Sequence, residues 1–240
     1  MTARFLTARW SYLAMLNYVV PPEILHPYVP KGTSLEPFDG MALVSVVGFL
    51  FQDTKLKGVP VPFHRNFEEV NLRFYVRREV DDEVRRGVVF IKEIVPRSAL
   101  ALVARLVYNE NYVAMSMEHE LGMDGDVPVD PVVYRWRWHD EWNEMAVTPY
   151  GDPMLPEPGS EVEFITEHYW GYAVQRDGGT VEYRVAHPTW EVWSVVDPVF
   201  LCDVAALYGQ QFVAPMDRQP HSAFLARGSK VDVYSGERIV

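Results

Sequence analysis

The sequence predicts an α+β domain, mainly of antiparallel β-strands, in which one large sheet is curled or closed. Segment 67–76 alternates strictly between apolar and polar residues, and a period of two is typical of a strand. Segments 161–173 and 180–186 flank Asp177-Gly178-Gly179, which is typical of a hairpin turn. About eight or nine such segments occur without a repeat or an obvious linker, so we expect a single domain over residues 1–240.

The composition is that of a folded, acidic protein. Of 240 residues, 48% are hydrophobic and 23% are charged, which is enough to build a full core. The net charge of −11 disfavours nucleic acid and anionic membranes as partners, because phosphate binding needs a basic surface. Cys202 is the only cysteine, so we expect no disulfide framework and a cytoplasmic location. No apolar stretch reaches the roughly 18–20 residues of a membrane span.

The first half of the chain predicts one helix and three strands. The apolar run 10–19 ends before Pro21 and predicts a short helix. Segment 41–51 is rich in Val, Leu and Phe and predicts a buried strand. A charged turn separates the alternating strand 67–77 from a strand over 87–95, so these two should form a hairpin.

The second half begins with segment 99–108, which is almost wholly apolar. Ser98 is a suitable N-cap, so a buried helix is expected there. The remaining elements follow from turn and breaker residues. We expect strands at 112–119 and 132–139, a Pro- and Gly-rich loop at 145–160, a helix at 199–208 that begins after Asp197 and stops at Gly209, and a final strand at 230–234.

The polar face of segment 67–76 is the first candidate site. It presents an acid, an amide, a cation and a phenol, from Glu69, Asn71, Arg73 and Tyr75. Such groups converge well on a small polar ligand if the face lines a cavity, while a solvated sheet face explains the alternation equally well. We predict that this face points to the interior and that the apolar face packs under a helix or another sheet, through Val70, Leu72, Phe74 and Val76.

Arg105 is the one charge in the apolar segment 99–108. Burying a guanidinium without a partner is costly. The side chain therefore either extends to water or reaches a polar cavity and pairs with a carboxylate, for which Glu69 is the first candidate and Glu93 the second. Under the second interpretation, Arg105→Leu should be strongly destabilising and Glu69→Gln should recover part of the loss.

Other motifs are absent or weak. The chain has no Gly-rich phosphate loop and no dinucleotide fingerprint, and we expect no cofactor. Glu118-His119-Glu120 resembles a metal cluster, but on a strand His119 faces away from both acids, so no metal site is expected. In segment 134–138 cations alternate with aromatic residues; in an acidic chain this favours buried tryptophans over nucleic-acid stacking.

Several segments, taken together and in order, resemble the YqjF-like family of uncharacterised proteins, a distant branch of the acetoacetate-decarboxylase-like superfamily. The resemblance covers roughly residues 9–235. The segments are Trp10-Ser11-Tyr12-Leu13, Asn17-Tyr18, Pro30-Lys31-Gly32-Thr33, Phe38-Asp39-Gly40-Met41-Ala42, the strand 67–76, Ala104-Arg105, Tyr183-Arg184-Val185-Ala186-His187-Pro188 and 222–229.

The resemblance implies a mostly antiparallel β-barrel or cone with a few flanking helices, enclosing a cavity and often oligomeric. It places Glu69 at the position of a cavity glutamate and keeps Arg105. Tyr112 and Val113 stand where the superfamily has its two lysines, and Tyr112 cannot form an imine. Lys92, on an expected strand with apolar neighbours, is the one remaining candidate for a reactive amine.

These observations favour a protein that binds a small anionic or carbonyl-bearing molecule, without Schiff-base chemistry. Arg73 and Arg105 would hold the ligand's oxygens, Glu69 would orient Arg105 or accept a proton, and Asn71, Tyr75 and Tyr112 would supply neutral hydrogen bonds. The alternatives are a structural protein with a packed interior, or a lyase that uses Lys92. Whether any reaction is catalysed stays open, and a homo-oligomer is possible.

Overall fold

The computed structural model describes residues 3–60, 65–96 and 111–240. The predicted helix 99–108, with Ser98 and Arg105, lies outside the described residues. Within the described part the chain forms mostly β-strands in one sheet of 15 strands and a separate two-stranded hairpin. The predicted fold class, mainly antiparallel β with a few helices, is confirmed.

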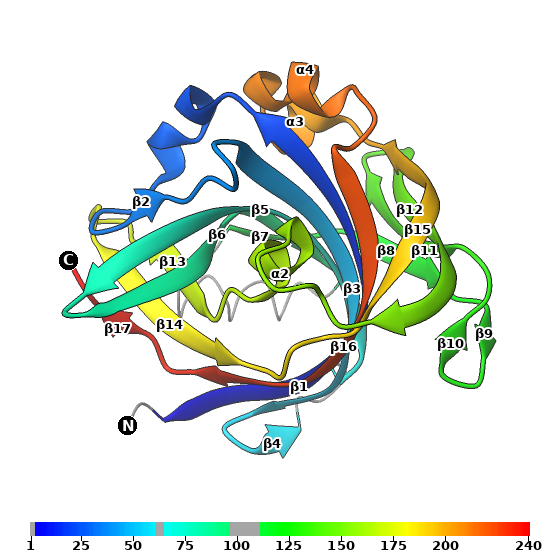
Figure 1. The fold of residues 1–240 in the computed structure, drawn as a ribbon, viewed down its shortest axis with the longest axis horizontal. Helices are drawn as coiled ribbons and strands as arrows, with labels where there is room; N and C mark the ends of the chain where they lie inside the picture. The colour runs from blue at the N-terminus through cyan, green and yellow to red at the C-terminus, as the bar shows by residue number, and fades with distance from the viewer. Residues whose placement is uncertain (1–2, 61–64, 97–110) are drawn as a thin grey trace.

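Seven strands form a closed ring (Figure 1). All neighbours pair antiparallel except β13 and β6, which pair in parallel. Pairing of β14 with β16 joins the two ends of the series. In ring order the strands are β14 (Thr180–Ala186), β13 (Trp170–Val174), β6 (Glu83–Val95), β5 (Phe67–Val80), β3 (Ala42–Leu56), β1 (Arg4–Val20) and β16 (Ser222–Tyr234).

The sheet continues beyond β16 and folds over the outside of the ring. This outer part consists of β15 (Val192–Leu201), β12 (Glu141–Met154), β11 (Val132–Trp138) and β8 (Ser116–Glu120). The short strands are β2 (Ser34–Leu35), β4 (Val59–Pro60), β7 (Tyr112–Ala114), β9 (Met123–Asp124), β10 (Val127–Pro128) and β17 (Glu237–Arg238). The helices are α2 (Glu161–Thr166), α3 (Val204–Leu207) and α4 (Val213–Met216), with 3-10 turns at Pro22–Ile24, His26–Tyr28 and Gln210–Phe212.

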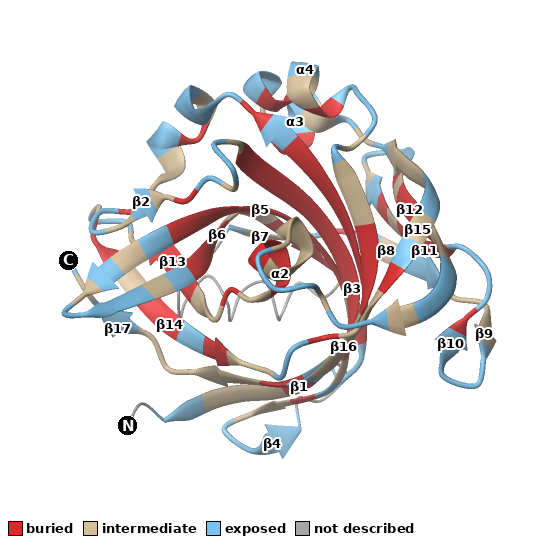
Figure 2. Ribbon diagram, viewed as in Figure 1, coloured by how far each residue is buried: buried red, intermediate tan, exposed pale blue. Residues whose placement is uncertain are grey.

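Two apolar cores lie on the two sides of the ring wall, so the central strands are buried on both faces (Figure 2). The inner core fills part of the ring and includes Met15, Phe49, Phe67, Tyr75 and Phe164 of α2. The outer core lies between the ring, the outer strands and the helices, and includes Leu16, Leu72, Phe74, Tyr134, Trp136 and Phe212. The apolar face of β5 therefore packs against the outer strands.

The predicted helix over 10–19 is wrong, because this segment is the centre of β1. Residues 13–18 are all buried, since β1 contributes to both cores. A strand buried on both faces reads as a continuous apolar run, which its sequence pattern does not distinguish from a buried helix. Long-range pairing with β3 and β16 decides its conformation.

The predicted loop at 145–160 is also wrong over its first part, where β12 extends to Met154. A register shift between Tyr150 and Met154 in its pairing with β15 accommodates Gly151, while Pro149 stays paired opposite Val195. The chain then forms α2 instead of the expected strand over 161–166, because Ser160 caps it by accepting a hydrogen bond from the Glu163 backbone N–H at 3.2 Å.

The predicted helix at 199–208 is shorter than expected and begins later. Residues 199–201 complete β15, and α3 starts only after Asp203, whose carboxylate accepts a hydrogen bond from the Ala206 N–H at 3.0 Å. Gly209 still follows the helix at a φ of 111°. The predicted strand 112–119 is interrupted at Met115. The predicted strands at 41–51, 67–77, 87–95 and 132–139, and the hairpin around Asp177-Gly178-Gly179, are confirmed within five residues at each end. The predicted strand 230–234 is only the end of β16, which begins at Ser222.

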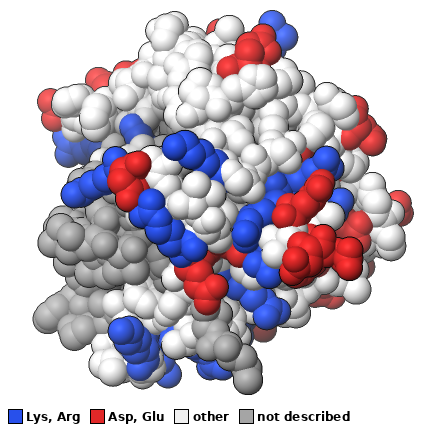
Figure 3. All heavy atoms as spheres, turned by 90° about the vertical axis from the view of Figure 1, so that its left-hand side faces the viewer, with Lys and Arg blue, Asp and Glu red and all other residues white. Residues whose placement is uncertain are grey.

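Cations and acids are mixed on the side of the molecule that carries the β5–β6 turn and β13–β14 (Figure 3). Several of them are paired there: Glu182 accepts from Arg78 at 2.9 Å and from Arg85 at 2.5 Å. The helices in the described part of the chain are all short, and none has the length and apolar character needed to cross a bilayer.

Candidate functional site

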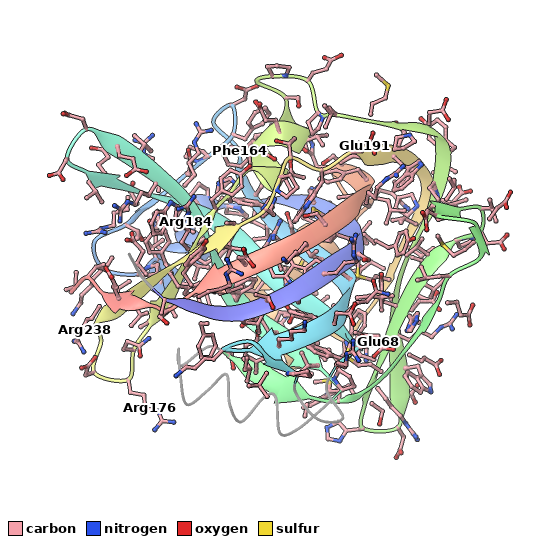
Figure 4. All side chains as sticks on the ribbon, turned by 90° about the horizontal axis from the view of Figure 1, so that it is seen from below. Glu68, Phe164, Arg176, Arg184, Glu191 and Arg238 are labelled. Atoms are coloured by element: carbon pink, nitrogen blue, oxygen red, sulfur yellow. The ribbon has the colours of Figure 1, made fainter. Side chains whose placement is uncertain are left out.

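The ring encloses a cavity of about 120 Å³. Its walls are mostly apolar and include Trp10, Phe49, Phe67 and Trp190, and residues from the end of α2 and just after it also line it. Figure 4 shows α2 and its labelled Phe164 at one end of the ring. The polar residues that line the cavity include Glu69, Asn71, Arg73, Glu93, Tyr112, Thr166, His168, Tyr183 and His187.

Strand β5 supplies three of these polar groups because of its alternation. Glu69, Asn71 and Arg73 lie on the cavity face, and their apolar neighbours lie in the outer core. Tyr75 lies on the same face but one step beyond the cavity, where its hydroxyl hydrogen-bonds with Ser45 Oγ at 2.5 Å. Asn71 is directly opposite Glu93 of β6, so the two side chains share a face.

Glu69 is a carboxyl group held away from water, with its side chain in the inner wall and the residue only 3% exposed. The Asn71 amide Nδ2 donates a hydrogen bond to Glu69 Oε1 at 2.9 Å. Burial raises the pKa of Glu69 to about 7, although the Asn71 hydrogen bond and the charge of Arg73 act in the opposite direction. A carboxyl group with this pKa exchanges protons near neutral pH, which suits an acid–base role.

Arg73 is a buried cation, only 8% exposed, that has no ion-pair partner among the described residues. Its Nη2 donates to the Ile165 carbonyl at 3.3 Å and approaches the Met15 sulfur at 3.9 Å, and its Nε has no acceptor. Burial of an uncompensated guanidinium is unfavourable. The residue is therefore suited to bind an anionic group that enters the cavity.

Tyr112 and Glu93 form the opposite polar part of the wall. Tyr112, which the family resemblance aligns with a lysine of the superfamily, hydrogen-bonds Glu93. Burial, with the nearby charges of Glu69 and Glu93, holds the pKa of the Tyr112 phenol well above its usual value. The phenol is therefore neutral at physiological pH, and its hydroxyl is hydrogen-bonded to Glu93 in the cavity wall.

Two histidines of the cavity wall were missed from the sequence as site residues. Burial lowers the pKa of both His168 and His187, so both are neutral near pH 7. His168 Nε2 lies 3.5 Å from Glu36 Oε2, and Glu36 in turn pairs with Arg86 at 2.9 Å. His187 belongs to a segment of the family resemblance, whereas His168 lies in a segment, 161–173, that the sequence predicts only as a strand of a hairpin.

Lys92 does not line the cavity. It is directly opposite Leu72, which belongs to the outer core, so its side chain leaves the ring on the other face from Glu93. Burial lowers the pKa of Lys92, and the influence of Cys202 acts in the opposite direction. The structure thus brings Glu69, Asn71, Arg73 and Tyr112 together and keeps Lys92 apart from them.

In the described ranges, His, Cys, Asp and Glu form no group of three that could ligate a metal ion. His119, part of the sequence Glu118-His119-Glu120, instead contacts Glu68 of β5 through Nδ1 at 2.6 Å. The polar groups of the cavity are hydrogen-bond donors and acceptors, and they suit an organic ligand.

The DUF2071 family, described as uncharacterized conserved proteins, matches residues 7–230 of the chain. The chain belongs to this family. Uncharacterized protein YqjF from Bacillus subtilis is 27% identical over 180 residues, which are 75% of this chain and 72% of YqjF. The YqjF-like resemblance predicted from the sequence is confirmed. The description of the DUF2071 family names no activity.

Solved structures with a similar fold are acetoacetate-decarboxylase-like. Acetoacetate decarboxylase from Legionella pneumophila superposes with a TM-score of 0.67 at 12% identity, over 99% of this chain and 88% of the other. The biosynthesis enzyme MppR, complexed with pyruvate, gives 0.65 at 13% identity over 99% and 91%. An acetoacetate-decarboxylase-like enzyme from Sphingomonas wittichii gives 0.68 at 12% identity over 99% and 94%. These similarities show that the DUF2071 chain has this fold.

Proposed function

We propose that the protein binds a small organic anion with a carboxylate or carbonyl group in the cavity, without forming an imine. The observation that carries this proposal is Arg73, a buried guanidinium in the cavity wall that no described acid neutralises. A ligand carboxylate would supply the missing charge through charge-assisted hydrogen bonds. The cavity of about 120 Å³ is smaller than a drug-sized site and suits a molecule of a few heavy atoms.

The other polar groups have complementary roles in this proposal. Asn71 Oδ1 is an acceptor without a partner, the neutral Tyr112 hydroxyl donates to Glu93 and can accept through its oxygen, and Glu69 accepts or donates a proton near pH 7. A similar fold in MppR is known complexed with pyruvate, which supports a small oxo acid as the kind of ligand. Arg105, outside the described residues, remains a predicted second cation of the site. A cavity lined by these groups favours ligand binding over a purely structural role.

Arg73→Met should weaken the binding of pyruvate or acetoacetate by at least about tenfold, because the charge-assisted contact is lost. The same change should leave the free energy of unfolding unchanged or raise it, because an apolar side chain of similar length replaces a buried unpaired charge. Isothermal titration calorimetry and urea unfolding measure the two effects. Arg218→Met, at an exposed position, is the control and should change neither.

Opposite effects on binding and stability separate a ligand-binding arginine from one that supports the fold. If Arg73→Met is destabilised and binding is unchanged, the proposal is wrong. If neither acid binds to the parent protein, Arg73 does not select this class of ligand. Arg73→Lys keeps the charge but not the two-pronged geometry, so it should bind with intermediate affinity.

Borohydride treatment in the presence of acetoacetate or pyruvate should leave the intact mass unchanged. Tyr112 replaces the imine-forming lysine, and Lys92 lies on the other side of the ring wall. Imine formation needs an amine that reaches the bound carbonyl. A reduced adduct mapped to Lys92 would favour the lyase alternative, and an adduct on another lysine would contradict the absence of imine chemistry altogether.

A further inference from the structure

An open groove of about 960 Å³ runs along the outer side of the ring and shares a single lining residue, Phe5, with the cavity. It is formed by β1, β3 and β16, which lie side by side in Figure 4, and by the turn after β3. We call it the basic groove because five of the side chains that line it are cations: Arg4, Arg9, Lys55, Lys57 and Lys230.

The charge of the basic groove contrasts with that of the whole chain. Asp53 is the one acid in its lining, so the formal charge there is +4 (five cations and one carboxylate), whereas the whole chain carries −11. Three of the five lysines of the chain lie in this groove. The sequence has 33 acidic residues that could neutralise cations elsewhere on the protein. The concentration of cations in this groove therefore needs a physical reason.

Most of these cations lack a partner of opposite charge. Asp53 is held by Arg65 at 2.5 Å, and Arg4 is 3.6 Å from Asp232. The remaining four have no ion pair with any described residue: Arg9, Lys55, Lys57 and Lys230. The groove therefore has four positive groups available to a ligand.

The register of the sheet places like charges opposite each other, and a bound anion would relieve their repulsion. Arg9 of β1 is directly opposite Lys230 of β16, and like charges opposite each other destabilise a sheet. Lys55 is opposite Thr7, two residues along the same face of β1, so a third cation extends the cluster. A multiply charged anion placed between these strands would replace repulsion by charge-assisted hydrogen bonds.

We propose that the basic groove binds a compact, multiply charged anion of the organic phosphate class. The groove is concave and falls within the usual size range of small-molecule sites. A charge of +4 matches a di- or triphosphate group. A long polyanion or an anionic bilayer would extend beyond the groove and meet the acidic remainder of the surface, which repels it. This site is separate from the cavity and does not depend on the function proposed for it.

Isothermal titration calorimetry of the full chain with ATP, pyrophosphate, inorganic phosphate and adenosine tests the proposal. ATP and pyrophosphate should bind, phosphate should bind more weakly, and adenosine should not bind. The affinity should fall as ionic strength rises, because the contacts are between charges. The double variant Arg9→Gln with Lys230→Gln should bind ATP at least about tenfold more weakly.

The matched control is Lys31→Gln with Arg218→Gln. Both residues are exposed, both lie outside the groove lining, and the double change alters the net charge by the same amount. This control should bind ATP like the parent protein. Lys230→Gln alone should also raise the melting temperature of the ligand-free protein slightly, because it removes the charge opposite Arg9.

Equal losses in the groove variant and the control would overturn the proposal, because binding would then reflect net charge alone. The proposal also fails if neither ATP nor pyrophosphate binds. Binding of phosphatidylserine vesicles or a single-stranded oligonucleotide in preference to ATP would overturn the assignment to a compact anion. If pyrophosphate binds as well as ATP, the phosphate chain is the recognised group; tighter binding of ATP indicates that the groove also recognises the nucleoside.

Discussion

Gly228→Ala is expected to lower the free energy of unfolding by about 3 kcal/mol or more, as severe backbone clashes do. Gly228 lies in β16 at a φ of 78°, directly opposite Ser11 of β1. An added Cβ would lie 2.1 Å from the Trp10 carbonyl oxygen and 2.8 Å from Leu13 Cδ1. The carbonyl belongs to a paired strand and has little freedom to move, so the clash would separate β16 from β1.

Gly40→Ala is the matched control, because it adds the same methyl group at nearly the same backbone angle. Gly40 has a φ of 80°, and nothing lies within 4 Å of the added Cβ. In Gly40→Ala the free energy of unfolding should fall by only about 1–2 kcal/mol, which is the cost of a non-glycine residue in the left-handed conformation. Urea unfolding gives both values. A similar loss in the two variants would show that strand β1 yields easily and that backbone conformation alone accounts for the effect.

Glu69→Gln is expected to remove a pH dependence of stability on the order of 3 kcal/mol, from a shift of the Glu69 pKa from 4.5 to about 7. The glutamine can still accept the hydrogen bond that Asn71 donates at 2.9 Å, so the packing of the wall is preserved. The variant differs from the parent chiefly in having no proton to lose at this position.

The direction in which stability changes with pH follows from the number of protons that the folded and unfolded states bind. Between its unfolded pKa and about 7, the Glu69 carboxyl is protonated in the folded protein and ionised in the unfolded chain. The folded state then binds more protons, so stability falls as pH rises through this range. The stabilising effect is complete below the unfolded pKa and is lost as pH passes the folded pKa.

The comparison that measures it is the free energy of unfolding of the parent protein and Glu69→Gln at about pH 5 and about pH 8. The parent should lose more stability than the variant between these two pH values, and other titrating groups cancel in the difference. Parallel pH profiles for the two proteins would mean that Glu69 is ionised in the fold, and its proposed acid–base role would then be wrong.

Part of the site could be predicted from the sequence because its signal is local. The alternation of 67–76 assigned Glu69, Asn71 and Arg73 to one face of a strand, and the structure places that face on the cavity. The sequence likewise shows directly that position 112 is a tyrosine, which cannot form an imine. His168 could not be predicted, because it reaches the wall from the segment after α2, and only the folding of distant segments brings it there.

The sequence by itself determined the hairpin of β5 and β6, the two faces of β5 and the lack of an imine-forming residue at position 112. These properties depend on residues close together in the chain, so they hold in any fold that buries one face of the strand. Tertiary structure alone decided that 10–19 is a strand, that β14 pairs with β16, and that burial raises the pKa of Glu69 to about 7. The physical reason is that strand pairing and desolvation depend on contacts between residues far apart in the chain, which no local pattern records.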